Sequence, residues 1–306
     1  MSKVIVITGA GLGLGKTLAV RFAADGDTVV LLGRTASKVE AVAEQIGARA
    51  VAIGCDVSSP DQVDAAFAAI AARFGKIDVL INNAAIYEAS PLATASDEHI
   101  LSVINTNLLG PILCARAAIP LLRRSGQIIN VSSESVEIPF AHLVLYQTSK
   151  AGLEGFSVNL ARELEPEGIR VCVVRAGQMI DEEKVFTMDP AAAMALAQAC
   201  LERGINLMQR PFSHFRNISN IFRALVDLSP DIHIAKVEMH ARAQNDCGLL
   251  RRRLPTSRRM SDDPGGVRSA SRQTRRAFDR GTSWVILSSS TQRQASLQFG
   301  STDRTA

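Results

Sequence analysis

The sequence has 306 residues, of which 47% are hydrophobic and 21% charged. This length suits one large α/β domain plus a remainder, and the composition excludes a disordered or fibrous protein. Residues 243–306 contain twelve Arg and five Asp but no Lys or Glu, which leaves a net charge of −3 on residues 1–242 of a chain that carries +4 overall. The main body therefore has no charge that would favour nucleic acid as a partner.

Short β-branched segments alternate with Ala-rich segments of helical period along residues 1–242. This alternation predicts a Rossmann-like, doubly wound parallel sheet of seven strands in a three-layer α/β domain. Ser59 followed by Pro60 marks a helix start, and Gly47 and Gly75 mark helix ends. Strands are expected at residues 3–8, 28–33, 50–55, 78–83, 126–132, 169–175 and 232–239.

A glycine-rich segment follows the first predicted strand, and a helix is expected from about Lys16. A dinucleotide pyrophosphate needs residues without Cβ atoms for close backbone approach, then a helix N-terminus whose free N–H groups face the anion. Glycine clusters also form simple tight turns, but this place between strand and helix favours a cofactor site. The residues expected to bind the cofactor here are Thr8, Gly9, Gly11, Gly13, Leu14 and Gly15.

The second predicted strand ends at Arg34, without the carboxylate that accepts a hydrogen bond from the ribose 2′-hydroxyl of NAD(H). A guanidinium attracts the 2′-phosphate of NADP(H) instead. NADP(H) is therefore the favoured cofactor. NAD(H) stays the alternative if Arg34 lies on the adenine or points to solvent.

Tyr146 and Lys150 are four residues apart at the start of a predicted helix, and hence lie on one of its faces. A phenol with an ordinary pKa of ~10 is a poor acid or base at neutral pH, and a nearby ammonium lowers that pKa. Such pairs are common on helix surfaces. Serines at the end of the fifth predicted strand, thirteen residues before Tyr146, supply a third polar group.

Taken together, these motifs resemble the classical branch of the short-chain dehydrogenase/reductase family over residues 3–242. The spacing Thr-Gly-x-x-x-Gly-x-Gly is unlike that of the extended epimerase branch. The resemblance implies an NAD(P)(H)-dependent oxidoreductase that interconverts a ketone or aldehyde with an alcohol. Tyr146 would be its general acid and base.

The resemblance also implies roles for individual residues. Ser133 would bind the substrate oxygen, with Ser132 or Ser135 as alternatives, and Lys150 would bind the nicotinamide ribose. Asn107 would hold a water that links Lys150 to solvent, or would distort its helix without a catalytic duty. Further cofactor contacts, with Asp56 at the adenine amino group, are implied for Asp56, Val57, Asn83, Ala84, Ala85, Tyr146, Lys150, Gly177 and Met179.

Three positions depart from the family pattern. Ala85 replaces a glycine, Ala176 replaces the proline before Gly177, and Asp181 stands where a threonine often contacts the nicotinamide carboxamide. These departures leave room for a second reading, in which the chain is an NADP(H)-binding regulator or scaffold with little turnover.

Residues 178–230 interrupt the alternation with two helical segments, and we expect them to form a substrate lid over the carboxyl ends of the strands. Apolar side chains here favour a bulky hydrophobic substrate, although such residues also belong to ordinary cores. The candidate pocket wall comprises Val136, Ile138, Phe140, Met179, Val185, Phe186, Met188, Met194, Met208, Phe212 and Phe215.

The remaining expectations concern partners, compartment and tail. Five scattered Cys residues without a Cys-x-x-Cys pair favour a reducing compartment, and no membrane span, signal layout or metal site is expected, which points to the cytoplasm. The resemblance implies a homodimer or homotetramer formed through residues 96–122 and 146–165. Residues 243–306 are expected to be a disordered basic tail, and their lack of Lys and Glu leaves a reading-frame artefact open.

Overall fold

The computed structural model describes residues 2–180 and 188–243. The strands in these ranges are β1 (Val4–Thr8), β2 (Thr28–Gly33), β3 (Ala50–Gly54), β4 (Ile77–Asn82), β5 (Leu122–Ser133), β6 (Arg170–Ala176), β7 (Met179–Ile180), β8 (Ser213–His214) and β9 (Lys236–Met239). The helices are α1 (Gly13–Ala24), α2 (Ala36–Ile46), α3 (Pro60–Phe74), α4 (Asp97–Ile104), α5 (Gly110–Ala118), α6 (Val144–Glu163), α7 (Pro190–Leu201) and α8 (Phe215–Asp227). A π-helical turn (Asn105–Leu109) joins α4 to α5, and short 3-10 turns lie at Leu92–Thr94, Ile119–Leu121, Glu134–Val136, Glu165–Glu167 and Leu207–Gln209.

Seven strands pair in parallel in the order β3-β2-β1-β4-β5-β6-β9, and β7 and β8 form a separate two-stranded pair. This arrangement confirms the predicted Rossmann-like α/β fold. The strand order reverses at β1, which has β2 on one side and β4 on the other. In open α/β sheets, ligands bind outside the carboxyl ends of the strands at this reversal.

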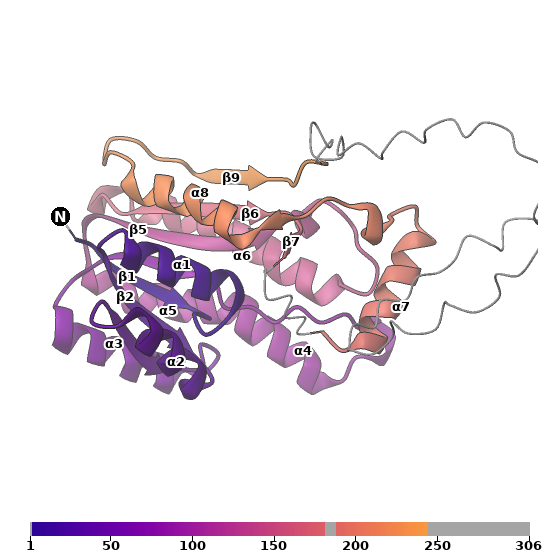
Figure 1. The fold of residues 1–306 in the computed structure, drawn as a ribbon, viewed down its shortest axis with the longest axis horizontal. Helices are drawn as coiled ribbons and strands as arrows, with labels where there is room; N and C mark the ends of the chain where they lie inside the picture. The colour runs from indigo at the N-terminus through magenta and orange to yellow at the C-terminus, as the bar shows by residue number, and fades with distance from the viewer. Residues whose placement is uncertain (1, 181–187, 244–306) are drawn as a thin grey trace, which may run out of the picture. The chain divides into compact units, whose positions relative to one another are not determined.

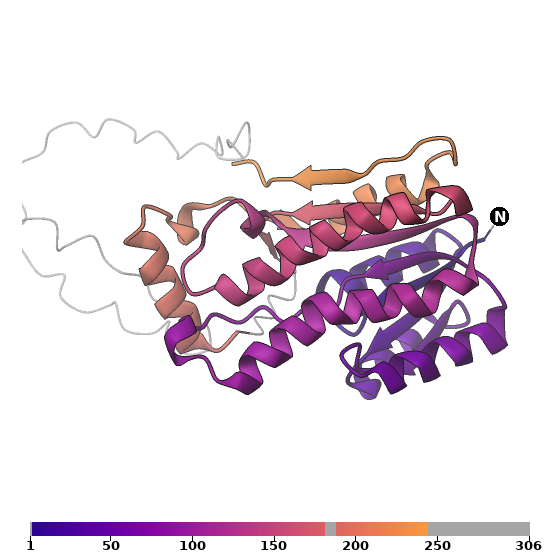
Figure 2. The ribbon, with the colours of Figure 1, turned by 180° about the vertical axis from the view of Figure 1, so that it is seen from behind.

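Helices cover both faces of the sheet. In Figure 1, α1 and α8 lie in front of the strands, and Figure 2 shows α4, α5 and α6 across the opposite face. Side chains alternate between the two faces along each strand, so that Ile5 and Ile7 join the core under α1, α2 and α8, whereas Val6 joins the core under α3, α5 and α6. The two hydrophobic cores hold every strand of the central sheet in a fixed position, which fixes the strand ends as well.

Local sequence signals account for several helix boundaries. The Ser59 hydroxyl accepts a hydrogen bond from the backbone N–H of Gln62 at the start of α3, with Pro60 as the first helical residue. Gly47 and Gly75 cap the C-termini of α2 and α3, as predicted. The boundaries of β5 and β9 differ from the prediction. β5 begins at Leu122, before a register shift against β4, and β9 begins only at Lys236.

The two helices of the predicted lid have different surroundings. α8 buries Ile218, Phe222 and Leu225 in the same core as α1, so it covers one face of the sheet as a structural helix rather than part of a lid. α7 packs its buried residues Leu196 and Cys200 in a separate small cluster. Helical periodicity predicted both helices, but it does not reveal which apolar surface a helix covers.

The run Asp97–Leu121 is the one described helical segment that matches a membrane span in length and mean hydropathy (1.3), whereas the sequence analysis expected none. In the structure its parts pack against α3 and α6. The side chain of Asn107, in the middle of the run, is fully buried and hydrogen-bonded to protein groups. We therefore interpret the run as a core helix of the folded domain.

Four cysteines in the described ranges, Cys55, Cys114, Cys172 and Cys200, are free and buried. The predicted basic tail lies outside the described residues beyond Ala243, and so do Cys247, Asp181 and the wall candidates Val185 and Phe186.

Candidate active site

The glycine-rich segment forms a tight turn between β1 and α1. A Cβ atom on Gly15 would lie 2.4 Å from the Gly9 carbonyl oxygen and 2.6 Å from the Asn83 amide nitrogen. A Cβ atom on Gly9 would lie 2.8 Å from the Cα of Ala84. Both positions therefore require glycine, because real Cβ atoms do not approach other atoms so closely. The turn leaves the N-terminus of α1 at the carboxyl end of β1.

Thr8 and Asn83 fasten this turn to β4. The Thr8 hydroxyl accepts hydrogen bonds from the backbone N–H groups of Asn83 and Ala84, both at 3.0 Å, and the Asn83 side chain donates to the Thr8 carbonyl at 3.0 Å. Thr8 was expected to contact the cofactor. Its side chain is buried and hydrogen-bonded to the backbone after β4, so it stabilises the glycine turn.

Cationic side chains stand at the end of β2. Arg34 is exposed, and its guanidinium forms no ion pair or hydrogen bond with another described side chain. Lys38 is exposed too, and a Cβ atom on Gly11 would lie 2.9 Å from the Cβ of Lys38. The sequence analysis missed Lys38, because only the fold brings the first turn of α2 against the glycine turn. Two positive charges therefore flank the glycine turn.

Asp56 lies after β3, next to the buried Val57. One of its carboxylate oxygens accepts hydrogen bonds from the Ser58 N–H at 2.9 Å and the Ser58 hydroxyl at 2.7 Å. These bonds fix the orientation of the carboxylate.

At the end of β5 the structure brings Ser133, Tyr146 and Lys150 together. The Ser133 side chain lies near enough to the Tyr146 phenol to lower its pKa, and the Lys150 ammonium lies 5.7 Å from the centre of the Tyr146 ring. The Lys150 Nζ atom donates a hydrogen bond of 2.7 Å to the carbonyl oxygen of Val131 on β5. Of the serine alternatives, Ser132 bonds to Glu154, and the buried Ser135 hydroxyl has no hydrogen-bond partner among the described residues.

Burial dominates the acid–base properties of this group. It raises the pKa of Tyr146 to about 12, although the nearby Ser133 side chain acts in the opposite direction. Burial also lowers the pKa of Lys150 to about 8, because the ammonium loses its hydration. The sequence analysis expected the ammonium to lower the pKa of the phenol. In the protein alone, desolvation outweighs that effect and keeps Tyr146 protonated at neutral pH.

Asn107 is fully buried in the π-helical turn. Its side chain accepts a hydrogen bond from the Ile86 N–H at 2.7 Å and donates to the Ile86 carbonyl at 2.9 Å and to the Ser149 hydroxyl at 3.2 Å. The residue thus ties the segment after β4 to the first turns of α6. The helix is distorted into a π-helical turn at this position.

Tyr87 is a neighbour that the sequence did not single out. Its ring meets the Tyr146 ring edge to face, with centroids 4.9 Å apart. Phe140 and Met188 pack in the same small cluster as Tyr146 beside α7. Among the other predicted wall residues, Met194, Met208 and Phe212 are 69%, 79% and 49% exposed, so they form no enclosed wall here. Phe215 lies beside Gly13 instead.

The turn after β6 closes the far side of the site. A Cβ atom on Gly177 would lie 2.8 Å from the Met239 carbonyl oxygen and 3.2 Å from a carboxylate oxygen of Glu134. Met179 packs against the core under α1 and α8. Glu134, which follows Ser133, is buried and paired with Arg210 at 2.7 Å.

Comparisons with known proteins agree with this geometry. Residues 3–182 match the family model of the short chain dehydrogenases. The 3beta-hydroxysteroid dehydrogenase 1 of Eggerthella lenta is 39% identical over 203 residues, which cover 63% of this chain and 77% of that protein.

Two solved structures are also similar. A blue fluorescent protein from a metagenomic library, in complex with NADPH, is 28% identical with a TM-score of 0.66, and the match covers 78% of this chain and 96% of that one. A 3-ketoacyl-(acyl-carrier-protein) reductase of Brucella melitensis, complexed with NADH, is 25% identical with a TM-score of 0.64 over the same shares. The chain therefore belongs to the short-chain dehydrogenase family.

Proposed function

We propose that the protein is an NADP(H)-dependent oxidoreductase that interconverts a ketone or aldehyde with an alcohol, with Tyr146 as general acid and base. The observation that carries this proposal is the grouping of Ser133, Tyr146 and the buried ammonium of Lys150 at one end of β5. A hydroxyl, a phenol and an ammonium at the carboxyl end of β5 form a donor set suited to a substrate oxygen that gains negative charge.

The residues present fit a nicotinamide dinucleotide. The glycine turn and the N-terminus of α1, with Gly11, Gly13 and Leu14, would receive the pyrophosphate, because Cβ atoms would obstruct the backbone there. Asp56 would contact the adenine amino group, and Val57 and Ala85 would form further contacts with the cofactor. When bound, the cofactor supplies the hydride.

The exposed cations at the end of β2 support NADP(H) over NAD(H). Arg34 and Lys38 would attract a ribose 2′-phosphate, and Arg34 occupies the position where an NAD(H)-selective site carries a carboxylate. NAD(H) remains the alternative, since similar proteins have been solved with NADPH and with NADH.

In the reductive direction, Ser133 and Tyr146 hold the carbonyl oxygen, and Tyr146 releases its proton to that oxygen as it becomes an alkoxide. The raised pKa of about 12 keeps Tyr146 in the protonated, donating form at neutral pH. Lys150 stabilises the phenolate that remains, and its backbone partner Val131 holds the ammonium in place.

We propose a hydrophobic small molecule as the substrate. Tyr87, Phe140 and Met188 are the apolar neighbours of Tyr146 in the described residues, and similar proteins are named for hydroxysteroid and ketoacyl substrates. The free buried cysteines suit a cytoplasmic protein. We also propose a homodimer or homotetramer.

The test is NADPH and NADH oxidation across a panel of steroid, acyl and aromatic ketones. Wild-type protein should turn over at least one ketone, faster with NADPH, and Tyr146→Phe should lower kcat by about 10²–10⁴-fold with NADPH affinity unchanged. Tyr87→Phe is the matched control and should retain turnover. Tight NADPH binding without turnover of any ketone would favour the scaffold reading instead.

A further inference from the structure

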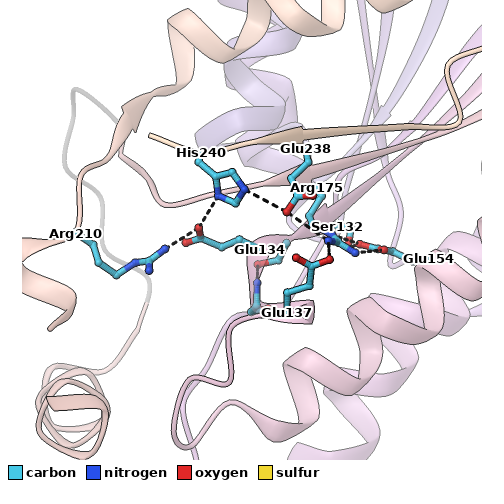
Figure 3. Close-up of polar contacts among 10 residues, drawn as sticks. Ser132, Glu134, Glu137, Glu154, Arg175, Arg210, Glu238 and His240 are labelled. Carbon is cyan, nitrogen blue, oxygen red and sulfur yellow. Dashed lines mark hydrogen bonds and ion pairs between the residues drawn. The ribbon is translucent and has the colours of Figure 1, made fainter. Parts of the chain in front are cut away.

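A polar row crosses the sheet next to the candidate site. Ser132, Arg175 and Glu238 are register partners on the parallel strands β5, β6 and β9, so their side chains project from the same face. Figure 3 shows the three side chains meeting beside α6, which contributes Glu154. The row sits one residue before the end of each strand.

Arg175 is the centre of this row. Its side chain is 4% exposed, and its guanidinium contacts both oxygens of Glu154, from Nε at 2.9 Å and from Nη2 at 2.6 Å. Its Nη1 atom donates to Glu238 at 3.3 Å and also to Glu137. The two-point contact with Glu154 requires the planar fork of arginine, which lysine cannot reproduce.

Glu154 is ionised in this environment and completes the link to β5. Although burial opposes ionisation, the hydrogen bonds from Arg175 and Ser132 hold the pKa of Glu154 below its usual range. The Ser132 hydroxyl donates to Glu154 Oε1 at 2.7 Å. One carboxylate therefore joins strand β5, strand β6 and helix α6.

The residues that this carboxylate joins are neighbours of the candidate catalytic groups. Ser132 directly precedes Ser133. Glu154 lies one helical turn after Lys150 and two turns after Tyr146, at the spacing that places all three on one side of α6. On the other flank of Ser133, Glu134 is anchored to Arg210 at 2.7 Å and to His240 at 3.5 Å (Figure 3). The strand end that carries Ser133 is thus held by charged side chains on both sides.

We propose that Arg175 is a positioning residue, which, through Glu154 and Ser132, sets the distance and angle between the Ser133 hydroxyl on β5 and the Tyr146 phenol on α6. The arginine touches neither group. It fixes the strand and the helix that carry them, so that Ser133 and Tyr146 are aligned before a substrate binds. The consequence for turnover rests on the proposed function, whereas the alignment itself does not.

The chain has only two tyrosines, which allows a direct measurement without substrate. In a Tyr87→Phe background, protein labelled with carbon-13 at tyrosine Cζ gives a single resonance, from Tyr146. Its chemical shift reports the polar surroundings of the phenol, to which the Ser133 side chain contributes. We expect Arg175→Lys to shift or broaden this resonance, and Ser132→Ala to do the same with little risk of unfolding.

Arg223→Lys is the matched control. The Arg223 side chain is also largely buried, and it pairs with Asp27, which precedes β2, and with Asp227, at the end of α8. These ion pairs lie at the amino ends of the strands, whereas Ser133 lies at the carboxyl end of β5. The control variant should lower stability but leave the Tyr146 resonance unchanged. If Arg175→Lys fails to fold, the Ser132→Ala spectrum decides. An unchanged resonance in the folded test variants, or an equal change in Arg223→Lys, would overturn the proposal.

Turnover of the same variants separates positioning from stability. At a temperature where all are folded, Arg175→Lys and Ser132→Ala should lower kcat by about tenfold or more, with the KM for NADPH nearly unchanged. Arg223→Lys should keep the wild-type kcat. If wild-type protein reduces no ketone, the proposed function fails, and the spectra still decide whether Arg175 aligns Tyr146.

Discussion

At the scale of single residues, the buried charge of Lys150 in the candidate site lowers the stability of the folded protein. Its ammonium is 2% exposed, and burial lowers its pKa from the ordinary value of 10.5 to about 8. Between these two values the unfolded chain binds more protons than the folded one, so stability rises as the pH increases from about 8 to 10.5. Below about pH 8 the folded protein carries the full cost of the buried charge.

Lys150→Met should therefore stabilise the protein at pH 7. Removing the buried charge should raise the free energy of unfolding by ~3 kcal/mol, as the pKa shift implies. Loss of the hydrogen bond to Val131 should lower it by ~1 kcal/mol, so the net increase is ~2 kcal/mol. Urea unfolding at several pH values measures it, and the rise above pH 8 should be absent from the variant. Lys76→Met is the control, because Lys76 also donates to a carbonyl but is exposed. A less stable Lys150→Met protein at pH 7 would contradict this account.

Gly15 provides a residue-scale prediction for the cofactor turn. Gly15→Ala places a Cβ atom within 2.6 Å of both Gly9 and Asn83, so the turn must open and NADPH binding should be lost. Gly155→Ala is the matched control, since a Cβ atom there meets nothing within 4 Å and removes a flexible residue from α6. Fluorescence titration with NADPH measures both, and equal affinity in the two variants would refute the assignment of the turn.

At the scale of elements, α7 and α8 differ in what they bury. α8 shares the main core with α1, whereas α7 packs in a small cluster near Tyr146. Hydrogen exchange should therefore show α8 amides opening only with the whole domain and α7 amides opening locally at lower free energy. Equal protection of the two helices would contradict a lid-like role for α7.

Sequence patterns predicted the seven strands well, because buried parallel strands are short apolar runs between glycine-marked helices. They did not predict that α8 packs in the main core, since helical periodicity does not show which apolar surface a helix packs against. Family spacing selected Ser133 over Ser132, whose hydroxyl is hydrogen-bonded to Glu154 in the structure. The role of Arg175 could not be predicted, because its neighbours Ser132 and Glu154 are distant in sequence and only the strand register brings them together.

At the scale of the whole molecule, exposed apolar side chains on α4 and α6 support self-association. Leu101 on α4 and Val158 on α6 are 58% and 52% exposed, and these two helices pack against each other. Light scattering of the full chain should give a multiple of the monomer mass of 32.8 kDa. The double variant Leu101→Lys, Val158→Lys should be monomeric, with Val144→Lys, on the first turn of α6, as the control. A monomeric wild-type protein would exclude this assembly.

The most direct test of the account follows the hydride itself. NADPH carrying deuterium at the reactive C4 position is incubated with the best ketone of the panel, and the alcohol is analysed by mass spectrometry. Wild-type protein should place deuterium on the carbinol carbon, and Tyr146→Phe should form labelled alcohol at least about a hundredfold more slowly. Alcohol without deuterium, or labelled alcohol formed at the wild-type rate by Tyr146→Phe, would contradict hydride transfer assisted by Tyr146.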